Sequence, residues 1–187
     1  MLALLFTTLV SAQEAPPIVN GEETDEFPQV GSLASFANNG SGYDFCSGTL
    51  VHQNWVITAA HCVEAIDDNE RYGYNNHYFI VGTDIYTNSG VHDYAEIVAW
   101  YEHPDYSTRN LDYDIGILQL GGNGITSVTP MAVNDDRPEA SWGDITYVGW
   151  GMTGDNDWNS SGTKRTVDIG IYYVDNNHVY TYDSDYN

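Results

Sequence analysis

The chain has 187 residues, of which 42% are hydrophobic and 13% aromatic, so it can form a folded core and is not composed like a disordered protein. Its 27 acidic and 5 basic residues give a formal net charge of −22. This charge disfavours nucleic acid and anionic membrane surfaces as partners. The length favours one or two compact units.

The N-terminal region has the pattern of a targeting segment. Residues 1–10 are an apolar run, followed by the small residues Ser11 and Ala12. Such a run is similar to the core and cleavage site of a secretory signal, and it is too short to span a bilayer. We predict a signal peptide at residues 1–12 and a secreted, extracellular protein, or a periplasmic one in a bacterium. Residues 13–17 contain two prolines, which resist helix and central strand, and are predicted to be a short pro-segment.

Six short apolar segments follow between Pro28 and Leu120, separated by turns rich in glycine, asparagine and aspartate. They show no long helical periodicity, which predicts six strands of one β-barrel. The segments are residues 30–36, 45–51, 55–60, 77–81, 95–101 and 115–120.

A second, smaller set of strands is predicted after a glycine-rich linker at residues 121–124. It contains residues 145–150 and 167–174. A barrel must close to remove its exposed edges, and two or three strands are too few to close. We therefore predict an incomplete second barrel, whose unpaired edges leave this half of the isolated chain poorly soluble or partly molten.

The sequence at residues 58–62 (TAAHC) places His61 directly beside Cys62. A histidine that acts as a general base needs one ring nitrogen aimed at a nucleophile and the other hydrogen-bonded to an orienting carboxylate. Cys46 is the one candidate partner for Cys62, and a disulfide there would help to fix the ring. Two free buried thiols are the alternative. Zinc is disfavoured, because two cysteines sixteen positions apart lack the clustered spacing of a zinc site.

Five motifs, in order along the chain, resemble those of trypsin-like serine proteases, the chymotrypsin family. They are residues 18–21 (IVNG), 27–30 (FPQV), 58–62 (TAAHC), 114–120 (DIGILQL) and 149–151 (GWG). Five ordered motifs are far more specific than any one alone. The resemblance implies an all-β, trypsin-like double β-barrel, with a complete first barrel at residues 18–121 and a partial second barrel at residues 122–187.

The resemblance also implies the catalytic residues. His61 matches the general base, and Asp114 matches the carboxylate that orients it. Asp112 is a nearby competitor, but it does not directly precede the apolar run that matches the family. The other five histidines are expected to be structural or solvated.

The resemblance further implies a Cys46–Cys62 disulfide, which an oxidising extracellular compartment permits. Ile18 is implied to be the mature N-terminus. Pro17 precedes it, whereas trypsin-like activation requires Arg or Lys at that position, so the activation route stays open.

One motif of the family does not occur in the sequence. The family carries its nucleophilic serine in a Gly-Asp-Ser-Gly-Gly segment, and Ser184 lies in an acidic stretch without flanking glycines. We expect a C-terminally incomplete fragment that lacks the catalytic serine, the oxyanion-hole amides and the base of the specificity pocket. Such a fragment is predicted to be inactive by itself.

The resemblance implies a serine-type endopeptidase, which hydrolyses peptide bonds in protein or peptide substrates through a Ser-His-Asp triad. No cofactor is implied, proteinaceous inhibitors are candidate partners, and a monomer is expected. A non-catalytic homologue that serves as an extracellular binding or regulatory module is the alternative. Such a module has no chemical reason to retain both His61 and Asp114.

Acidic clusters such as residues 22–26 and 67–70 are expected to be solvated turns. A weaker alternative is an acidic, calcium-dependent extracellular binding domain, because some relatives bind calcium in a loop that matches the region of Asp84, Asp93 and Glu96. Their spacing does not reproduce a ligand pattern, so we assign no metal.

Residues 39–41 and 159–161 are N-glycosylation sequons, which matter only in a host that glycosylates. The glycines of the Gly-Trp-Gly motif at residues 149–151 are expected to permit close backbone approach.

Overall fold

The structure is a computed structural model that describes residues 21–154, 157–176 and 178–182. The predicted signal peptide, the pro-segment and Ile18 lie outside the described residues. Most of the regular structure is strand. The strands are β1 (Glu22–Glu23), β2 (Val30–Phe36), β3 (Gly42–His52), β4 (Trp55–Thr58), β5 (Asn76–Gly82), β6 (Val91–Glu102), β7 (Gly116–Leu120), β8 (Asp144–Gly149), β9 (Arg165–Val174) and β10 (Val179–Tyr182), and the helices are α1 (Ala60–Arg71) and the short 3-10 helices η1 (Ala140–Trp142) and η2 (Trp158–Ser160).

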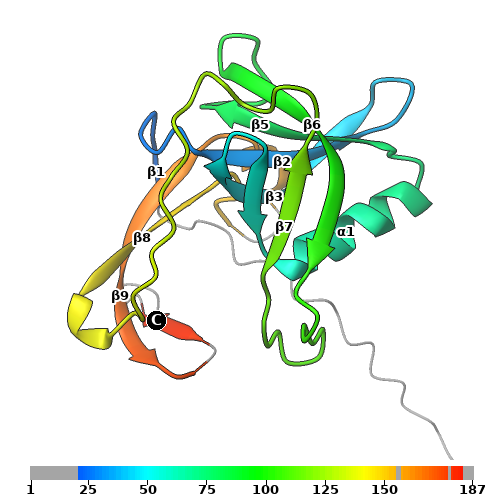
Figure 1. The fold of residues 1–187 in the computed structure, drawn as a ribbon. Helices are drawn as coiled ribbons and strands as arrows, with labels where there is room; N and C mark the ends of the chain where they lie inside the picture. Colours follow the sequence, from blue (N-terminus) through cyan, green and yellow to red (C-terminus); the bar gives the residue numbers. More distant parts are fainter. Residues whose placement is uncertain (1–20, 155–156, 177, 183–187) are drawn as a thin grey trace, which may run out of the picture.

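Six strands close into a barrel in the order β2-β3-β4-β7-β6-β5, and neighbouring strands are antiparallel (Figure 1). These strands correspond to the six segments predicted from the sequence, so the prediction of a first β-barrel is confirmed. The bounds differ most in β6, which begins at Val91 instead of residue 95. Strand β4 ends at Thr58 instead of residue 60, because the chain turns there into α1.

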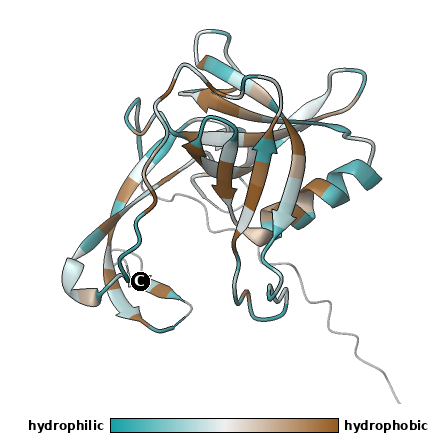
Figure 2. Cartoon of the chain, viewed as in Figure 1, coloured by the Kyte–Doolittle hydropathy of each residue, from teal (hydrophilic) through white to brown (hydrophobic). Residues whose placement is uncertain are grey.

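The barrel encloses the main hydrophobic core. Side chains alternate along β7, where Leu118 and Leu120 are buried and Ile117, which precedes Leu118, is 41% exposed. Apolar residues lie in every strand of the barrel (Figure 2). All members of the core cluster lie between Leu33 and Ile125, so the second set of strands contributes none of them. None of the helices in the described ranges is long and apolar enough to cross a bilayer.

Helix α1 is absent from the sequence prediction, which places residues 67–70 in a turn, and that prediction is wrong. The inward face of the helix includes Cys62, Val63, Ile66 and Asn69, at the spacing of an amphipathic helix. The apolar stripe is short because its last member is the polar Asn69. The helix also begins without a capping side chain of its own, so two of the usual sequence signals for a helix are weak.

The second sheet is open in the described residues, with β9 at its centre (Figure 1). Strand β8 pairs along one part of β9 and β10 along another, while β1 pairs through Glu22 and Glu23. Strands β8 and β9 correspond to the predicted segments, whereas β10 was not predicted. Strand β1 precedes the barrel in sequence but lies in this sheet, so a division of the chain at residue 121 separates β1 from its partner.

The Gly-Trp-Gly motif joins the second sheet to the barrel. Trp150 is 1% exposed, and its backbone N–H donates to Oγ of Ser47 in β3 at 3.0 Å. Gly162 N–H donates to the carbonyl of Trp150, and Ile85 N–H donates to the carbonyl of Gly162. The expected close backbone approach at Gly151 is wrong, since a Cβ added there would meet no heavy atom within 4 Å.

Candidate active site

The N-terminal end of α1 is capped by a residue from another element. Its own N-cap residue, Ala59, makes no side-chain capping bond, and its first turn holds no acidic residue. The first N–H groups of a helix have no partner within the helix. Here the backbone N–H of His61 donates to Oδ1 of Asp114 at 2.9 Å. A carboxylate from the segment before β7 therefore replaces the missing cap, at the end of the helix where the dipole favours negative charge.

The same carboxylate holds the ring of His61. Nδ1 of His61 lies 2.7 Å from Oδ2 of Asp114, and the two side chains are 33% and 20% exposed. An ionised carboxylate only accepts hydrogen bonds, so Nδ1–H is the donor. In the neutral ring the lone pair then lies on Nε2. The pair thus presents a partly accessible basic nitrogen in a fixed orientation.

The predicted disulfide between Cys46 and Cys62 is present, with Cα atoms 6.0 Å apart. It ties β3 to the first turn of α1, beside His61. Sγ of Cys62 lies 3.4 Å from Nε2 of His61. Within the described ranges, these three residues form a group whose potential metal-binding atoms lie within 4.8 Å of one another. The two sulfurs are bonded to each other, however, so they are not the thiolates that bind zinc.

Asp112, the competing candidate, has a different partner. Its Oδ1 lies 3.8 Å from Nε2 of His178, at the turn between β9 and β10. Leu111 and Tyr113 on either side of Asp112 have φ angles of 56° and 55°, in the left-handed region that residues other than glycine rarely adopt. Among the described contacts, the structure brings Asp114 to His61 and Asp112 to the second sheet.

Two further residues near the candidate active site, Tyr106 and Glu64, were missed by the sequence prediction. The hydroxyl of Tyr106 donates to Oε2 of Glu64 on α1 at 3.4 Å. Burial, followed by the negative charges of Glu64 and Asp114, raises the pKa of Tyr106 to about 12. The phenol therefore stays protonated at physiological pH and acts as a donor beside the site. No sequence pattern marks these residues, because they meet only when the segment before β7 packs against α1.

The three acidic residues considered for calcium do not gather into a metal-binding group within the described part of the chain. Oδ1 of Asp84 accepts the backbone N–H of Tyr86 at 2.7 Å, and Oδ1 of Asp93 accepts that of Tyr94 at 2.9 Å. Glu96 is exposed on β6. Asp84 thus accepts a backbone N–H within its own loop, whereas Asp93, in β6, accepts the backbone N–H groups of Tyr94 and of Ser127.

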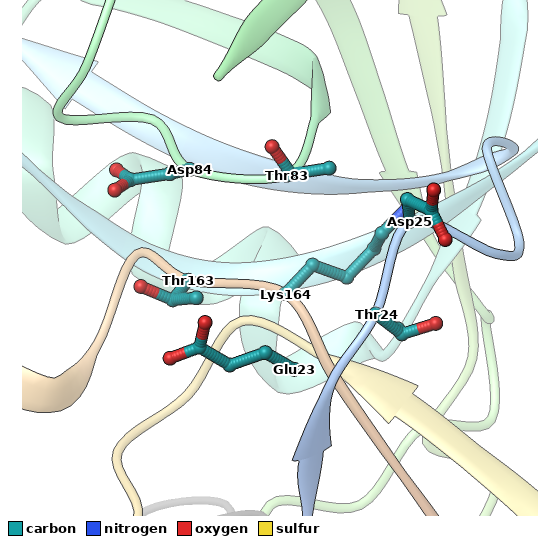
Figure 3. Close-up of a pocket in the computed structure, with 7 residues that line it drawn as sticks. All are labelled: Glu23, Thr24, Asp25, Thr83, Asp84, Thr163 and Lys164. Atoms are coloured by element: carbon teal, nitrogen blue, oxygen red, sulfur yellow. The ribbon is translucent and has the colours of Figure 1, made fainter. Parts of the chain in front are cut away.

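A cavity of about 420 Å³ lies elsewhere, between the N-terminal segment, the barrel and the second sheet (Figure 3). Lys164 is 1% exposed there, its Nζ donates to the carbonyl of Phe27 at 3.4 Å, and burial lowers its pKa. The lining residues are Glu23, Thr24, Asp25, Thr83, Asp84, Thr163 and Lys164. Since neither His61 nor Asp114 lines this cavity, it is separate from the candidate active site.

Comparison with known protein families shows which family the chain belongs to. The family model described as Trypsin matches residues 18–185. The chain belongs to the trypsin family. Trypsin-1 of Salmo salar is 32% identical over 158 residues, which cover 82% of this chain and 60% of that protein. Trypsin-3 of Salmo salar is 33% identical over 132 residues, with 70% and 52% covered. Chymotrypsin-like elastase family member 1 of Macaca fascicularis is 31% identical over 174 residues, with 82% and 60% covered.

These matches confirm the predicted trypsin-like family, and the all-β fold and the disulfide agree with it. The matched part spans 60% or less of the length of these three trypsin-family relatives. Ser184 lies outside the described residues. The catalytic roles of His61 and Asp114 stay predictions.

Proposed function

We propose that this trypsin-family chain belongs to a serine endopeptidase, in which His61 is the general base and Asp114 the orienting carboxylate. The observation that supports this most strongly is the double contact of Asp114, with Oδ2 at Nδ1 of the ring and Oδ1 at the backbone N–H of the same histidine. Two fixed points prevent the carboxylate from turning, so the ring keeps the tautomer that leaves Nε2 basic.

In the proposed reaction, Nε2 of His61 accepts the proton of a serine hydroxyl as the serine oxygen attacks the peptide carbonyl. Asp114 stabilises the imidazolium that forms, and the ring then returns the proton to the leaving amine. A water molecule, activated by the same histidine, then hydrolyses the resulting acyl-enzyme. No hydroxyl in the described ranges is hydrogen-bonded to Nε2, and we propose that the serine comes from residues other than these 187.

The proposed substrates are proteins or peptides, and proteinaceous inhibitors and a monomeric state are proposed with them. We also propose that the protein is exported, through a signal peptide at residues 1–12. The Cys46–Cys62 disulfide supports export, because disulfides persist in oxidising compartments.

An active-site acylating reagent tests where the nucleophile lies. We expect no covalent labelling of the 187-residue chain, and labelling would show that this chain supplies a nucleophile after all. Reading the coding sequence beyond the codon for Asn187 is the second test. An in-frame Gly-Asp-Ser-Gly-Gly segment, and labelling of the longer polypeptide at its serine, are the expected results.

His61→Ala in the longer polypeptide should abolish that labelling, whereas His92→Ala, at an exposed position on β6, should leave it unchanged. A stop codon directly after Asn187 would instead favour the non-catalytic binding or regulatory module.

A further inference from the structure

The tip of the β2–β3 hairpin carries one of the two sequons. The turn is closed by two backbone hydrogen bonds, Ala37 N–H to the carbonyl of Ser41 at 2.8 Å and Gly40 N–H to the carbonyl of Ala37 at 2.9 Å. Asn39, Gly40 and Ser41 are all exposed. Gly40 has φ +84°, and a Cβ added there would meet no heavy atom within 4 Å, so the tip is open to a large substituent.

The side chains of this sequon contact each other. Oδ1 of Asn39 accepts the backbone N–H of Ser41 at 3.0 Å and the hydroxyl of Ser41 at 2.7 Å. The oxygen end of the amide is therefore held against the turn, with the serine hydroxyl beside it. Among the described residues, none accepts a hydrogen bond from Nδ2 of Asn39, so this nitrogen is the end of the amide that can react.

The second sequon has a different environment. Asn159 is exposed in η2, but Ser161 is partly buried, and its hydroxyl donates to Oδ1 of Asp44 at 3.1 Å. Asp44 lies in β3 and also accepts the hydroxyl of Tyr86. Folding thus engages the serine of this sequon in the contact between the second sheet and the barrel.

We propose that Asn39 is the acceptor of an N-linked oligosaccharide and that Asn159 is not, an inference that rests on the proposed export. The donor is a lipid-diphosphate-linked oligosaccharide of the secretory pathway. Nδ2 of Asn39 forms a bond to C1 of the first sugar, and the bond from C1 to the diphosphate oxygen breaks. The lipid diphosphate leaves with that electron pair, and one Nδ2 proton passes to a base of the transferase.

A glycan at this tip leaves the candidate active site open. The β2–β3 hairpin extends to the upper right in Figure 1. Tyr43, close to its tip, contacts Asn69 in the C-terminal half of α1, whereas His61 lies at the N-terminal end of the same helix. In the other sequon Asn159 is exposed, but the serine hydroxyl donates to Asp44 at the junction of the barrel and the second sheet. Only the hairpin tip therefore offers both an exposed asparagine and an exposed serine.

Translation of the full chain in the presence of secretory-pathway membranes tests the proposal. Protease protection reports import, and a glycosidase that removes N-linked glycans reports modification. The same chain behind a foreign signal sequence forms a parallel arm, so that import does not depend on residues 1–12. We expect a glycosidase-sensitive shift in mobility that is lost in Asn39→Gln and in Ser41→Ala, and kept in Asn159→Gln and in Ser41→Thr, which retains the hydroxyl.

Imported wild-type chain without a glycan would overturn the proposal, as would imported Asn39→Gln that still carries one. If the chain is imported only behind the foreign signal, the predicted native signal peptide is wrong. The glycosylation proposal is still tested, because the glycan can be measured on the chain that the foreign signal imports.

Discussion

At the scale of single residues, Asp114 serves two atoms of His61 at once. Its two carboxylate oxygens are chemically equal, so one can accept the backbone N–H while the other accepts Nδ1–H. An amide in the same place has one acceptor and one donor. Because the backbone N–H requires the acceptor, the amide NH₂ would face Nδ1.

Asp114→Asn is therefore expected to move the ring proton of His61 from Nδ1 to Nε2. The imidazole ¹⁵N shifts, measured near pH 9, where histidine is neutral, report the tautomer directly. Asp112→Asn is the matched control and should leave the tautomer unchanged. In the proposed complete enzyme the same substitution should lower kcat by about 10⁴-fold, the loss that a wrong tautomer causes in this kind of triad. A ring that keeps its proton on Nδ1 in Asp114→Asn would contradict this account.

His77 is a second histidine whose environment matters, although it lies away from the candidate active site. It is 3% exposed, Nδ1 lies 2.8 Å from Oγ of Ser35, and the ring packs against that of Trp100 in a T-shaped arrangement. Glu70 and Asp67 on α1 are the charged groups that face it, with Oε1 of Glu70 3.8 Å from Nε2. Burial lowers the pKa of His77 more strongly than these carboxylates raise it.

Acid should therefore weaken the fold through His77. Its folded pKa lies below the unfolded value of about 6.5, so the unfolded chain binds the proton more readily. The stability from the neutral ring is complete above about pH 6.5 and is lost as pH falls from there through the folded pKa. Urea denaturation should show that the stability difference between wild type and His77→Asn shrinks with falling pH. His92→Asn, at an exposed position, should show no such trend; parallel pH profiles for wild type and His77→Asn would refute the linkage.

At the scale of elements, α1 is attached to the barrel by a polar contact as well as an apolar one. Asn69, 5% exposed, donates from Nδ2 to Oγ of Ser35 in β2 at 2.9 Å, and its Oδ1 accepts the hydroxyl of Tyr43 in β3. The amide thus satisfies polar groups on two strands. This explains why the helix carries a polar residue on its inward face.

Asn69→Ala should lower the free energy of unfolding by about 1 to 3 kcal/mol, because it leaves buried polar groups without their partner. Asp68→Ala removes a neighbouring exposed side chain of the same helix and should cost less than about 1 kcal/mol. Equilibrium denaturation of both variants gives the comparison. Equal losses would mean that the contact of Asn69 with the two strands contributes little.

At the scale of the whole molecule, one of the two sets of strands is closed into a barrel and the other is not. The barrel has no free edge and encloses the core cluster, whereas the described second sheet is open and many of its aromatic side chains are exposed. The exposed tyrosines of β8, β9 and β10 are Tyr147, Tyr172, Tyr173, Tyr180 and Tyr182. Burial of apolar surface is the main source of stability, so the second sheet should be the weaker part.

Native-state hydrogen exchange of the 187-residue chain should reflect this difference. We expect amides of β8, β9 and β10 to exchange through local opening, well before those of β2, β5 and β7, which need unfolding of the barrel. Circular dichroism during thermal unfolding should then show the loss of the second sheet ahead of the barrel. A single cooperative transition with common protection of both sets would contradict the expectation.

The local pattern of the sequence was sufficient to predict the barrel strands and to place His61 beside Cys62. Alternating apolar residues between glycine-rich turns mark strands whatever their partners are, and adjacency is covalent. It was insufficient for α1, because the inward Asn69 interrupts the apolar stripe and the cap comes from Asp114, 53 positions away. The same limit applies to β1, whose partner strand lies in the other half of the chain.

The sequence by itself determined the family, the strands of the first barrel and the two residues proposed for catalysis, because ordered local motifs carry that information. Only the tertiary structure decided which contacts these residues make. Asp114 holds both Nδ1 and the backbone N–H of His61 while Asp112 lies near His178, and the hydroxyl of Ser41 stays within its own sequon while that of Ser161 donates to Asp44. In each case the two candidates, a pair of aspartates or a pair of sequon serines, have the same side-chain chemistry. The choice between them depends on which element packs against which, and that is a property of the folded chain.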